Sequence, residues 1–140
     1  LSTGSVDCLA LLDVLEHLER PRRALKEAAR VLRPGGRLVL SVPFLYPIHD
    51  APFDFQRYTM HGLMREVDRA GLTLSSLEAT GHAAESAGLL AALACGGSAQ
   101  AILRHSRKVA LILLPLPIAA IPLINIVAWV AARILPDWPA

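Results

Sequence analysis

The sequence has few of the residues that build disulfide frameworks or metal sites. Its two cysteines, Cys8 and Cys95, lie in apolar stretches without a CxxC spacing. Their placement excludes a disulfide framework and favours a reducing cytoplasm. The five histidines are scattered along the chain without ligand spacing: His17, His49, His61, His82 and His105. The sequence therefore predicts no metal site.

Charge is also scarce, and its distribution divides the chain. Charged residues make up 19% of the sequence and leave a formal net charge of +2. The basic residues form no dense run, so nucleic acid is not an expected partner. Residues 13–69 hold most of the charges, whereas residues 109–132 hold none. We expect an α/β domain over residues 1–82 and an apolar helical segment over residues 83–140.

The charged part opens with the pattern of a strand, a helix and a second strand. Val6–Leu12 is a nearly continuous apolar run, typical of a strand covered on both faces. Residues 21–32 place apolar side chains at helical spacing, and Pro34-Gly35-Gly36 predicts a tight turn. Residues 37–42 then form a second strand. Such a βαβ unit joins two parallel strands.

A proline-interrupted loop is expected over residues 43–58, just beyond the carboxyl end of a strand, where open α/β sheets bind ligands. Thr59 is the expected N-cap of a further helix, with Leu63, Met64, Val67 and Ala70 on one face, and Gly71 ends it. Leu72–Thr80 has the pattern of a third strand.

Residues 5–43 read SVDCLALLDVLEHLERPRRALKEAARVLRPGGRLVLSVP. The order of features in this stretch resembles class I S-adenosylmethionine-dependent methyltransferases, specifically the type 11, ubiquinone/menaquinone-methyltransferase-like group. The resemblance covers about residues 5–80. It implies a partial Rossmann-like fold in which Val6–Leu12, Arg37–Val42 and Leu72–Thr80 are strands four to six of a seven-stranded sheet, so that only the carboxyl-terminal part of the family's domain is present.

The resemblance also implies parts that this sequence does not contain. No glycine-rich loop follows a strand, and no acidic residue is placed to grip the cofactor ribose. The sequence begins without Met or a signal peptide. We therefore expect a fragment, truncated at both ends, that is inactive by itself and binds S-adenosylmethionine weakly.

Two groups of candidate site residues follow from the resemblance. The loop after the fourth strand would line the methionine end of S-adenosylmethionine through Leu12, Asp13 and Glu16, with His17 as a possible catalytic base. The alternative for Glu16 and His17 is that they only cap and solvate the next helix.

The second group lies in the loop PFLYPIHDAPFDFQRYT, residues 43–59. Polar groups held among prolines and aromatic side chains are typical of small-molecule pockets. His49 or Asp50 would be a catalytic base at the acceptor site. The expected substrate-binding residues are Tyr46, Phe55, Arg57 and Tyr58. The alternative is a surface loop in which Asp54 and Arg57 merely form an ion pair.

Three interpretations compete for the apolar stretch Val109–Ala132. A transmembrane helix would keep the basic residues around Arg104 and Lys108 in the cytoplasm beside the catalytic domain. Three prolines, at positions 115, 117 and 122, favour instead a kinked or re-entrant hairpin or an interfacial insertion with Trp129 and Trp138 at headgroup depth. The third interpretation is a helical cap over an apolar acceptor. Upstream, residues 83–108 predict a helix broken near Gly96-Gly97.

The predicted function is transfer of a methyl group, by the intact parent protein, to a small or lipid-linked acceptor at a cytoplasmic membrane surface. One alternative is a non-catalytic membrane-anchored α/β module. A less favoured one is a nicotinamide-dependent oxidoreductase, which would need a Tyr-x-x-x-Lys motif that neither Tyr46 nor Tyr58 provides.

Overall fold

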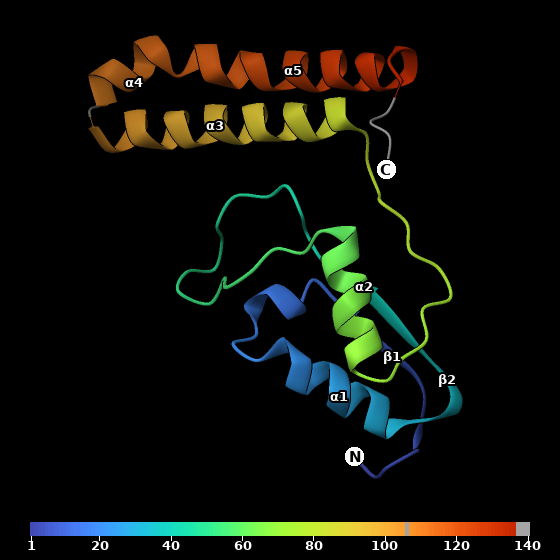
Figure 1. The fold of residues 1–140 in the computed structure, drawn as a ribbon. Helices are drawn as coiled ribbons and strands as arrows, with labels where there is room; N and C mark the ends of the chain where they lie inside the picture. Colours follow the sequence, from blue (N-terminus) through green and yellow to red (C-terminus); the bar gives the residue numbers. More distant parts are fainter. Residues whose placement is uncertain (106, 137–140) are drawn as a thin grey trace. The chain divides into compact units, whose positions relative to one another are not determined.

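The computed structural model describes residues 1–105 and 107–136, which fall into two compact units (Figure 1). Unit 1 is Leu1–Ala79 and contains the strands; unit 2 is Thr80–Ala140 and is helical in its described part. Trp138, one of the predicted headgroup-depth residues, lies outside the described residues.

Unit 1 contains the predicted βαβ arrangement. Strand β1 (Val6–Leu12) and strand β2 (Leu32–Ser41) pair in parallel, and helix α1 (Pro21–Val31) connects them. Pro21 is at the start of α1, as predicted, where its missing N–H costs no hydrogen bond. The α/β class is therefore confirmed.

Strand β2 begins earlier than the sequence predicts. Its pairing starts at Leu32 opposite Val6, and a register shift follows before Cys8 pairs with Arg37. Gly35 adopts a φ of 77°, which the predicted turn required. The Pro-Gly-Gly segment is thus an irregular start of β2 rather than a separate turn.

The helices of unit 1 cover one face of the two-stranded sheet. Leu15 and Leu25 are fully buried and form a core with Leu63 and Val67, against which the sheet packs. The opposite face carries Leu12, which is 57% exposed, among other apolar side chains. The prediction of a strand covered on both faces is wrong within this unit, because both of its longer helices pack on the same side (Figure 1).

Helix α2 (Met60–Arg69) begins and ends as predicted. The Thr59 hydroxyl accepts a hydrogen bond of 3.0 Å from the Gly62 amide, and Gly71 ends the helix with a φ of 81°. Met64, predicted for the buried face, is 41% exposed.

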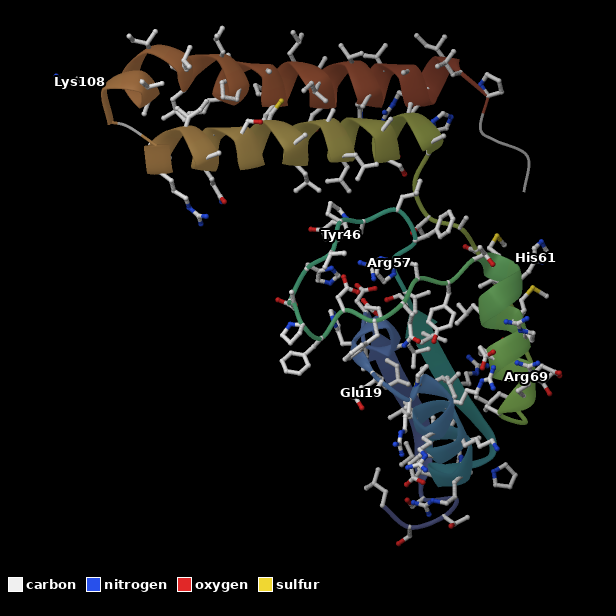
Figure 2. The ribbon with its side chains drawn as sticks, turned by 60° about the vertical axis from the view of Figure 1, so that its left-hand side comes forward. Glu19, Tyr46, Arg57, His61, Arg69 and Lys108 are labelled. Carbon is white, nitrogen blue, oxygen red and sulfur yellow. The ribbon has the colours of Figure 1, made fainter. Side chains whose placement is uncertain are left out.

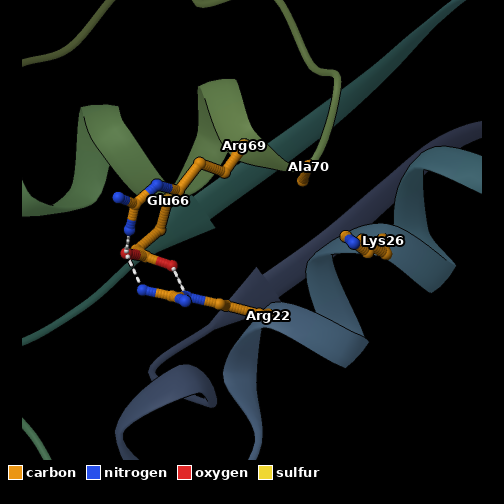
Figure 3. A pocket seen from close by; sticks show the side chains of 5 residues that line it. All are labelled: Arg22, Lys26, Glu66, Arg69 and Ala70. Atoms are coloured by element: carbon orange, nitrogen blue, oxygen red, sulfur yellow. Dashed lines mark hydrogen bonds and ion pairs between the residues drawn. The ribbon is translucent and has the colours of Figure 1, made fainter.

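An ion-pair network joins α2 to α1 (Figure 3). The Glu66 carboxylate accepts hydrogen bonds from Arg22 and, at 3.2 Å, from Arg69. The Arg22 guanidinium, through hydrogen bonding and charge, lowers the pKa of Glu66. A cleft of about 240 Å³ lies beside this network, and its polar groups serve helix packing.

Truncating Leu63 to Ala should destabilise unit 1 by about 2–5 kcal/mol, because the side chain is 7% exposed and leaves a cavity. Met64→Ala is the matched control in the next position. It should cost less than about 1 kcal/mol, since a largely exposed side chain loses few contacts. Hydrogen exchange of α1 and α2 amides in the full chain measures both. Equal protection in the two variants would contradict the described core.

The predicted third strand at Leu72–Thr80 does not form. These residues have no regular secondary structure, and the sheet has two strands. Leu72 and Leu77 pack against the core by their side chains. A strand also needs a backbone neighbour, and in the described chain β1 and β2 pair only with each other. Apolar alternation alone does not supply that partner.

Unit 2 is a helical hairpin. Helix α3 (Ala83–His105) is followed by α4 (Arg107–Leu113) and α5 (Pro115–Ile134), and α3 and α5 lie side by side (Figures 1 and 2). The predicted break at Gly96-Gly97 is wrong, because α3 continues through both glycines. Lateral contact with the rest of the hairpin outweighs the low helix propensity of glycine.

The predicted single stretch Val109–Ala132 is divided between α4 and α5 at Leu114. Pro115 and Pro117 lie in the first turn of α5, where no intrahelical donor is needed, and Pro122 lies inside α5. The observed helices form a hairpin, as in one of the interpretations made from sequence. The predicted hairpin lay within residues 109–132, whereas the first arm of the observed one is α3.

Candidate functional site

The candidate site lies at the carboxyl end of β1, where Asp13 joins the ends of the two strands. The Ser41 hydroxyl donates a hydrogen bond of 2.9 Å to the Asp13 carboxylate, and the Asp13 amide donates to the Ser41 carbonyl at 3.1 Å. Asp13 itself has a φ of 52°, a conformation that Asp tolerates better than most residues. The sharp turn there directs the chain into the short helix η1 (Leu15–His17).

Helix η1 buries Glu16 completely. The residue is 0% exposed, and within the described chain neither carboxylate oxygen has a hydrogen-bond partner. The nearest basic group is His17, whose Nε2 lies 3.8 Å from Glu16 Oε1. Burial of an unpartnered carboxylate is costly, so such a group indicates a role in binding or catalysis.

The surroundings of His17 define its tautomer. Nδ1 of His17 lies 2.8 Å from the carbonyl oxygen of Phe53, and a carbonyl can only accept. Nδ1 therefore carries the proton, and Nε2 of a neutral His17 presents a lone pair on the side of Glu16. Two hydrogen-bond acceptors thus face each other. A proton on Nε2 or a cation between them would satisfy both.

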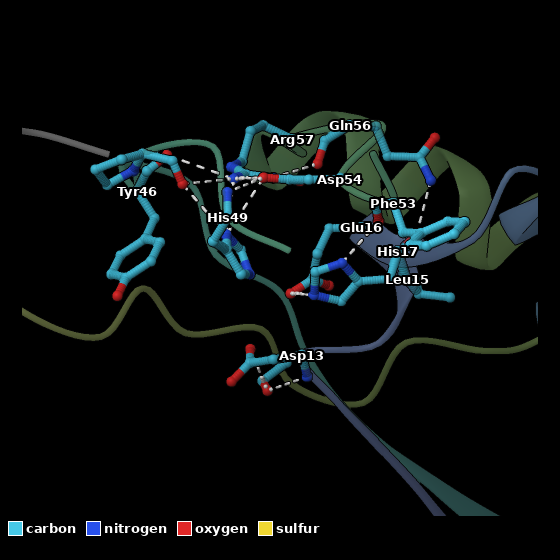
Figure 4. A network of polar contacts seen from close by, with 12 residues as sticks. Asp13, Leu15, Glu16, His17, Tyr46, His49, Phe53, Asp54, Gln56 and Arg57 are labelled. Atoms are coloured by element: carbon cyan, nitrogen blue, oxygen red, sulfur yellow. Dashed lines mark hydrogen bonds and ion pairs between the residues drawn. The ribbon is translucent and has the colours of Figure 1, made fainter. Parts of the chain in front are cut away.

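The loop between β2 and α2 brings His49 to the same place (Figure 4). The rings of His17 and His49 meet edge to face with centroids 4.8 Å apart. Nδ1 of His49 lies 3.2 Å from the Pro47 carbonyl and 3.3 Å from the Asp54 carboxylate, so this nitrogen also carries its proton. Its Nε2 is left as an acceptor.

Glu16, His17 and His49 can each offer one ligand atom, and these atoms lie within 4.8 Å of one another. A buried carboxylate with two imidazoles is a donor set that suits a divalent transition metal. The expectation of no metal site stays a prediction, but two of the histidines that looked scattered in the sequence, His17 and His49, meet in the fold. Residues 17 and 49 are distant in sequence and meet only through the fold of the loop.

Backbone and amide contacts fix the loop over η1. The Phe55 amide donates to the Glu16 carbonyl at 2.9 Å. The Gln56 side chain donates to the carbonyls of Leu15, at 2.7 Å, and Leu18, at 2.8 Å. Sequence reasoning did not identify Gln56, and no motif could have, because its partners are backbone carbonyls about forty residues away.

A buried ion pair shapes the loop internally. The Asp54 side chain is 2% exposed and accepts hydrogen bonds from Arg57, at 2.6 Å, and from the His49 amide, at 3.0 Å. Arg57 also contacts the carbonyls of Tyr46 and Pro47. The predicted alternative of an Asp54–Arg57 pair is confirmed, but the pair is internal and holds His49 rather than lying on the surface.

The Arg57 guanidinium and the His49 amide hold the pKa of Asp54 well below its ordinary value of 3.8. Because the folded-state pKa is lowered, Asp54 stabilises the loop above that ordinary value, and the stabilisation is lost as the pH falls. The His49 amide proton shift should therefore titrate with a midpoint below 3.8 in NMR spectra of the full chain. The Asp54→Asn variant should lack that titration, and a midpoint at 3.8 or above would exclude the ion pair in solution.

The structure brings some of the other predicted residues to this cluster. Tyr46 packs its ring edge against His49, with centroids 5.2 Å apart. Phe55 is 44% exposed, while its amide contacts Glu16. Both remain predicted substrate-binding residues.

Three other predicted residues lie apart from the cluster. Asp50 is exposed with a φ of 51°, and no side-chain hydrogen bond or ion pair of Asp50 is found among the described residues. Leu12 is at the exposed sheet face, and Tyr58 packs against the core, where burial raises its pKa. For none of these three residues is a side-chain hydrogen bond or ion pair to Glu16, His17 or His49 found among the described residues, so their predicted roles stay predictions.

Comparison with known proteins supports the resemblance found in the sequence. A family model described as a methyltransferase domain matches residues 1–40. This segment of the chain is therefore similar to part of a methyltransferase domain. The match lies in the amino-terminal region of the chain rather than its carboxyl-terminal region, and it ends before the predicted limit of residue 80. The assignment of strands four to six remains a prediction.

Curated relatives match this chain over short stretches. An uncharacterized 37.1 kDa protein in transposon TN4556 of Streptomyces fradiae is 56% identical over 43 residues, which is 31% of this chain and 12% of the relative. A ubiquinone biosynthesis O-methyltransferase of Xanthomonas oryzae pv. oryzae is 44% identical over 39 residues, 28% of this chain and 16% of that protein. The chain thus spans a small part of each relative. No solved structure matches it significantly.

Proposed function

We propose that this chain forms the acceptor side of an S-adenosylmethionine-dependent methyltransferase that methylates a hydroxyl group on a small or lipid-linked acceptor. The family match at residues 1–40 supports methyl transfer in general. The O-methyltransferase similar to this chain supports oxygen as the methylated atom. The observation that carries the proposal is the convergence of three proton-accepting groups, from Glu16, His17 and His49, beyond the carboxyl end of β1.

The bound cofactor supplies a methyl group on a positively charged sulfur. The acceptor oxygen forms its new bond to the methyl carbon while the carbon–sulfur bond breaks, so the hydroxyl proton must leave. His17 Nε2 takes that proton, and the Phe53 carbonyl keeps Nδ1 protonated throughout. The Glu16 carboxylate, 3.8 Å away, stabilises the resulting imidazolium. His49 Nε2 accepts a hydrogen bond from a second donor group of the acceptor, such as a neighbouring hydroxyl, and so orients it.

The residues present suit only one end of the cofactor. Asp13 follows β1 directly and offers a carboxylate to the cationic methionine amino group, and the buried charge of Glu16 suits the positive sulfur. The sequence holds no glycine-rich loop for the remainder. Further protein covering the exposed apolar face of the sheet would supply that part, consistent with a fragment. By itself the chain is expected to bind the cofactor weakly.

The test uses the longest natural polypeptide that contains residues 1–140, incubated with methyl-labelled S-adenosylmethionine and with catechol or a prenylated catechol. The expected product is an O-methyl ether, formed in step with S-adenosylhomocysteine. The products are identified by mass spectrometry and NMR. Methylation at nitrogen or carbon only, or no methylation of any hydroxyl acceptor, would overturn the proposal.

A second version of this chemistry uses a divalent cation on the same three side chains. The unpartnered Glu16 carboxylate and the inward acceptors of the two histidines favour it. A cation there would bind the acceptor oxygen and ease loss of its proton. Chelator treatment distinguishes the two versions. Loss of activity on dialysis against EDTA, with recovery on adding Mg²⁺, Mn²⁺ or Zn²⁺, would favour the cation. Unchanged activity would favour the histidine base.

A further inference from the structure

We propose that α3 and α5 cross a lipid bilayer as a helical hairpin, with the start of α3 on the membrane side from which the chain enters and the tip, where α3 ends and α4 begins, on the opposite side. Two helices in the described chain are long and apolar enough to span a membrane, Ala83–Arg104 and Pro115–Ile134. The inference is independent of the reaction that unit 1 catalyses.

The dimensions of both helices fit a bilayer. They contain 22 and 20 residues, which at about 1.5 Å per residue gives about 30 Å, the thickness of the hydrocarbon layer. Only 11% and 6% of their most apolar windows are buried, so these helices are not the core of a water-soluble unit. Some other apolar environment must cover them.

The side chains of α5 distinguish a spanning helix from one lying flat on the membrane. A helix in the interface needs a polar face. Between Leu116 and Ala132 the sequence contains no charge and one amide side chain, Asn125. Large exposed apolar side chains occur along the whole helix and point in several directions (Figure 2): Leu116, Ile118, Leu123, Ile126, Val127, Trp129, Val130 and Ile134. Such a surface suits lipid on all exposed sides.

The contact between the two helices has the small-residue character of membrane helix pairs. A Cβ atom at Gly88 would lie 2.4 Å from the Cβ of Ala128, so only glycine permits this approach. His82 Nε2 lies 3.2 Å from the Leu135 carbonyl, which places the start of α3 beside the end of α5. Both ends of the hairpin that lead to the rest of the chain are therefore on one side.

Polar groups mark both ends of the hairpin. Lys108 lies at the tip, at the beginning of α4 (Figure 2), and Arg104 closes the last turn of α3. At the open end the Arg133 guanidinium stacks 3.5 Å over the Trp129 ring, a pairing suited to the headgroup region. The arrangement predicted from the sequence, in which these basic residues stay beside the catalytic domain, stays a prediction that the labelling experiment below distinguishes from the proposed one.

Single-cysteine labelling of the full chain tests the topology. In a background with Cys8→Ser and Cys95→Ala, the variants Glu19→Cys and Lys108→Cys place reporters at exposed positions of unit 1 and the tip (Figure 2). Sealed membrane vesicles are treated with a membrane-impermeant maleimide before and after detergent permeabilisation. In intact vesicles we expect one reporter to react and the other to react only after permeabilisation. Equal labelling of both in intact vesicles, or release of the protein by alkaline carbonate, would overturn the proposal.

A pair of substitutions tests which part of α5 contacts lipid, without relying on the reporters. Ile126→Arg puts a charge in the middle of α5, and Ile134→Arg puts one at its end; both side chains are exposed. We expect Ile126→Arg to lower the carbonate-resistant fraction roughly tenfold, and Ile134→Arg to leave it near the parent level. Equal effects at the two positions would contradict a spanning helix.

Discussion

Replacing His17 with Ala is expected to lower kcat for methyl transfer roughly 10²- to 10⁴-fold, the usual contribution of a positioned general base. The substitution removes Nε2, the atom that we propose receives the acceptor proton, and also releases the Phe53 carbonyl. KM should change much less, because His17 acts when the proton moves rather than when the acceptor binds. The measurement is steady-state O-methylation of catechol by the parent polypeptide.

His61→Ala is the matched control for that experiment. His61 is an exposed residue in the first turn of α2 and contributes nothing to the cluster. Its replacement should leave kcat within about twofold of the parent value. If His17→Ala retained kcat at that level too, the interpretation in which residue 17 only solvates the following helix would stand, and His17 would not be the base.

The second large effect is expected for Glu16→Gln, which keeps the shape of the side chain and removes its charge. At about 4 Å a charge pair contributes up to about 4 kcal/mol at an effective dielectric constant of 20. The imidazolium formed on His17 would lose this stabilisation, so kcat should fall by up to roughly 10³-fold. KM should change much less than kcat, a split that a purely structural role would not produce.

The same variant should be more stable than the parent. Both oxygens of the buried Glu16 carboxylate lack hydrogen-bond partners, so removing the charge removes a desolvation cost. Greater protection of η1 and α1 amides together with a lower kcat is the pattern of a residue retained for function. Glu19→Gln, an exposed neighbour, should change neither quantity. Loss of both stability and activity in Glu16→Gln would indicate that Glu16 is structural.

Local rules predicted the βαβ unit and the start and end of α2. Pro21, Gly35 and Thr59 each occupy a position whose backbone geometry depends on neighbouring residues alone. No such rule predicted that Glu16 is buried or that helices cover β1 on one face only. Both features depend on which helices pack against the sheet, and short-range patterns do not encode that choice.

Two wrong predictions have the same physical origin. The Leu72–Thr80 pattern suits a strand, but this segment pairs with neither β1 nor β2 and instead packs Leu72 and Leu77 against the core. Gly96-Gly97 suits a helix break, but packing between α3 and the rest of the hairpin keeps α3 continuous. In both cases tertiary contacts, or their absence, override local preference.

The candidate site was predicted in part for a similar reason. Resemblance to the methyltransferases located Asp13, Glu16 and His17 beyond the first strand, and the Pro-rich loop located His49. Their convergence depends on Asp54, Arg57 and Gln56, which fold the loop back onto η1. Those contacts join residues up to 41 positions apart, beyond the reach of any spacing rule.

The central claim is that the acceptor hydroxyl binds against His17 and Glu16. The most direct measurement is a crystal structure of the parent polypeptide with S-adenosylhomocysteine and catechol bound. We expect a catechol oxygen within hydrogen-bonding distance, about 3 Å, of His17 Nε2, on the side facing the cofactor sulfur. A catechol bound to the cofactor's methyl side but away from Glu16, His17 and His49 would contradict the account.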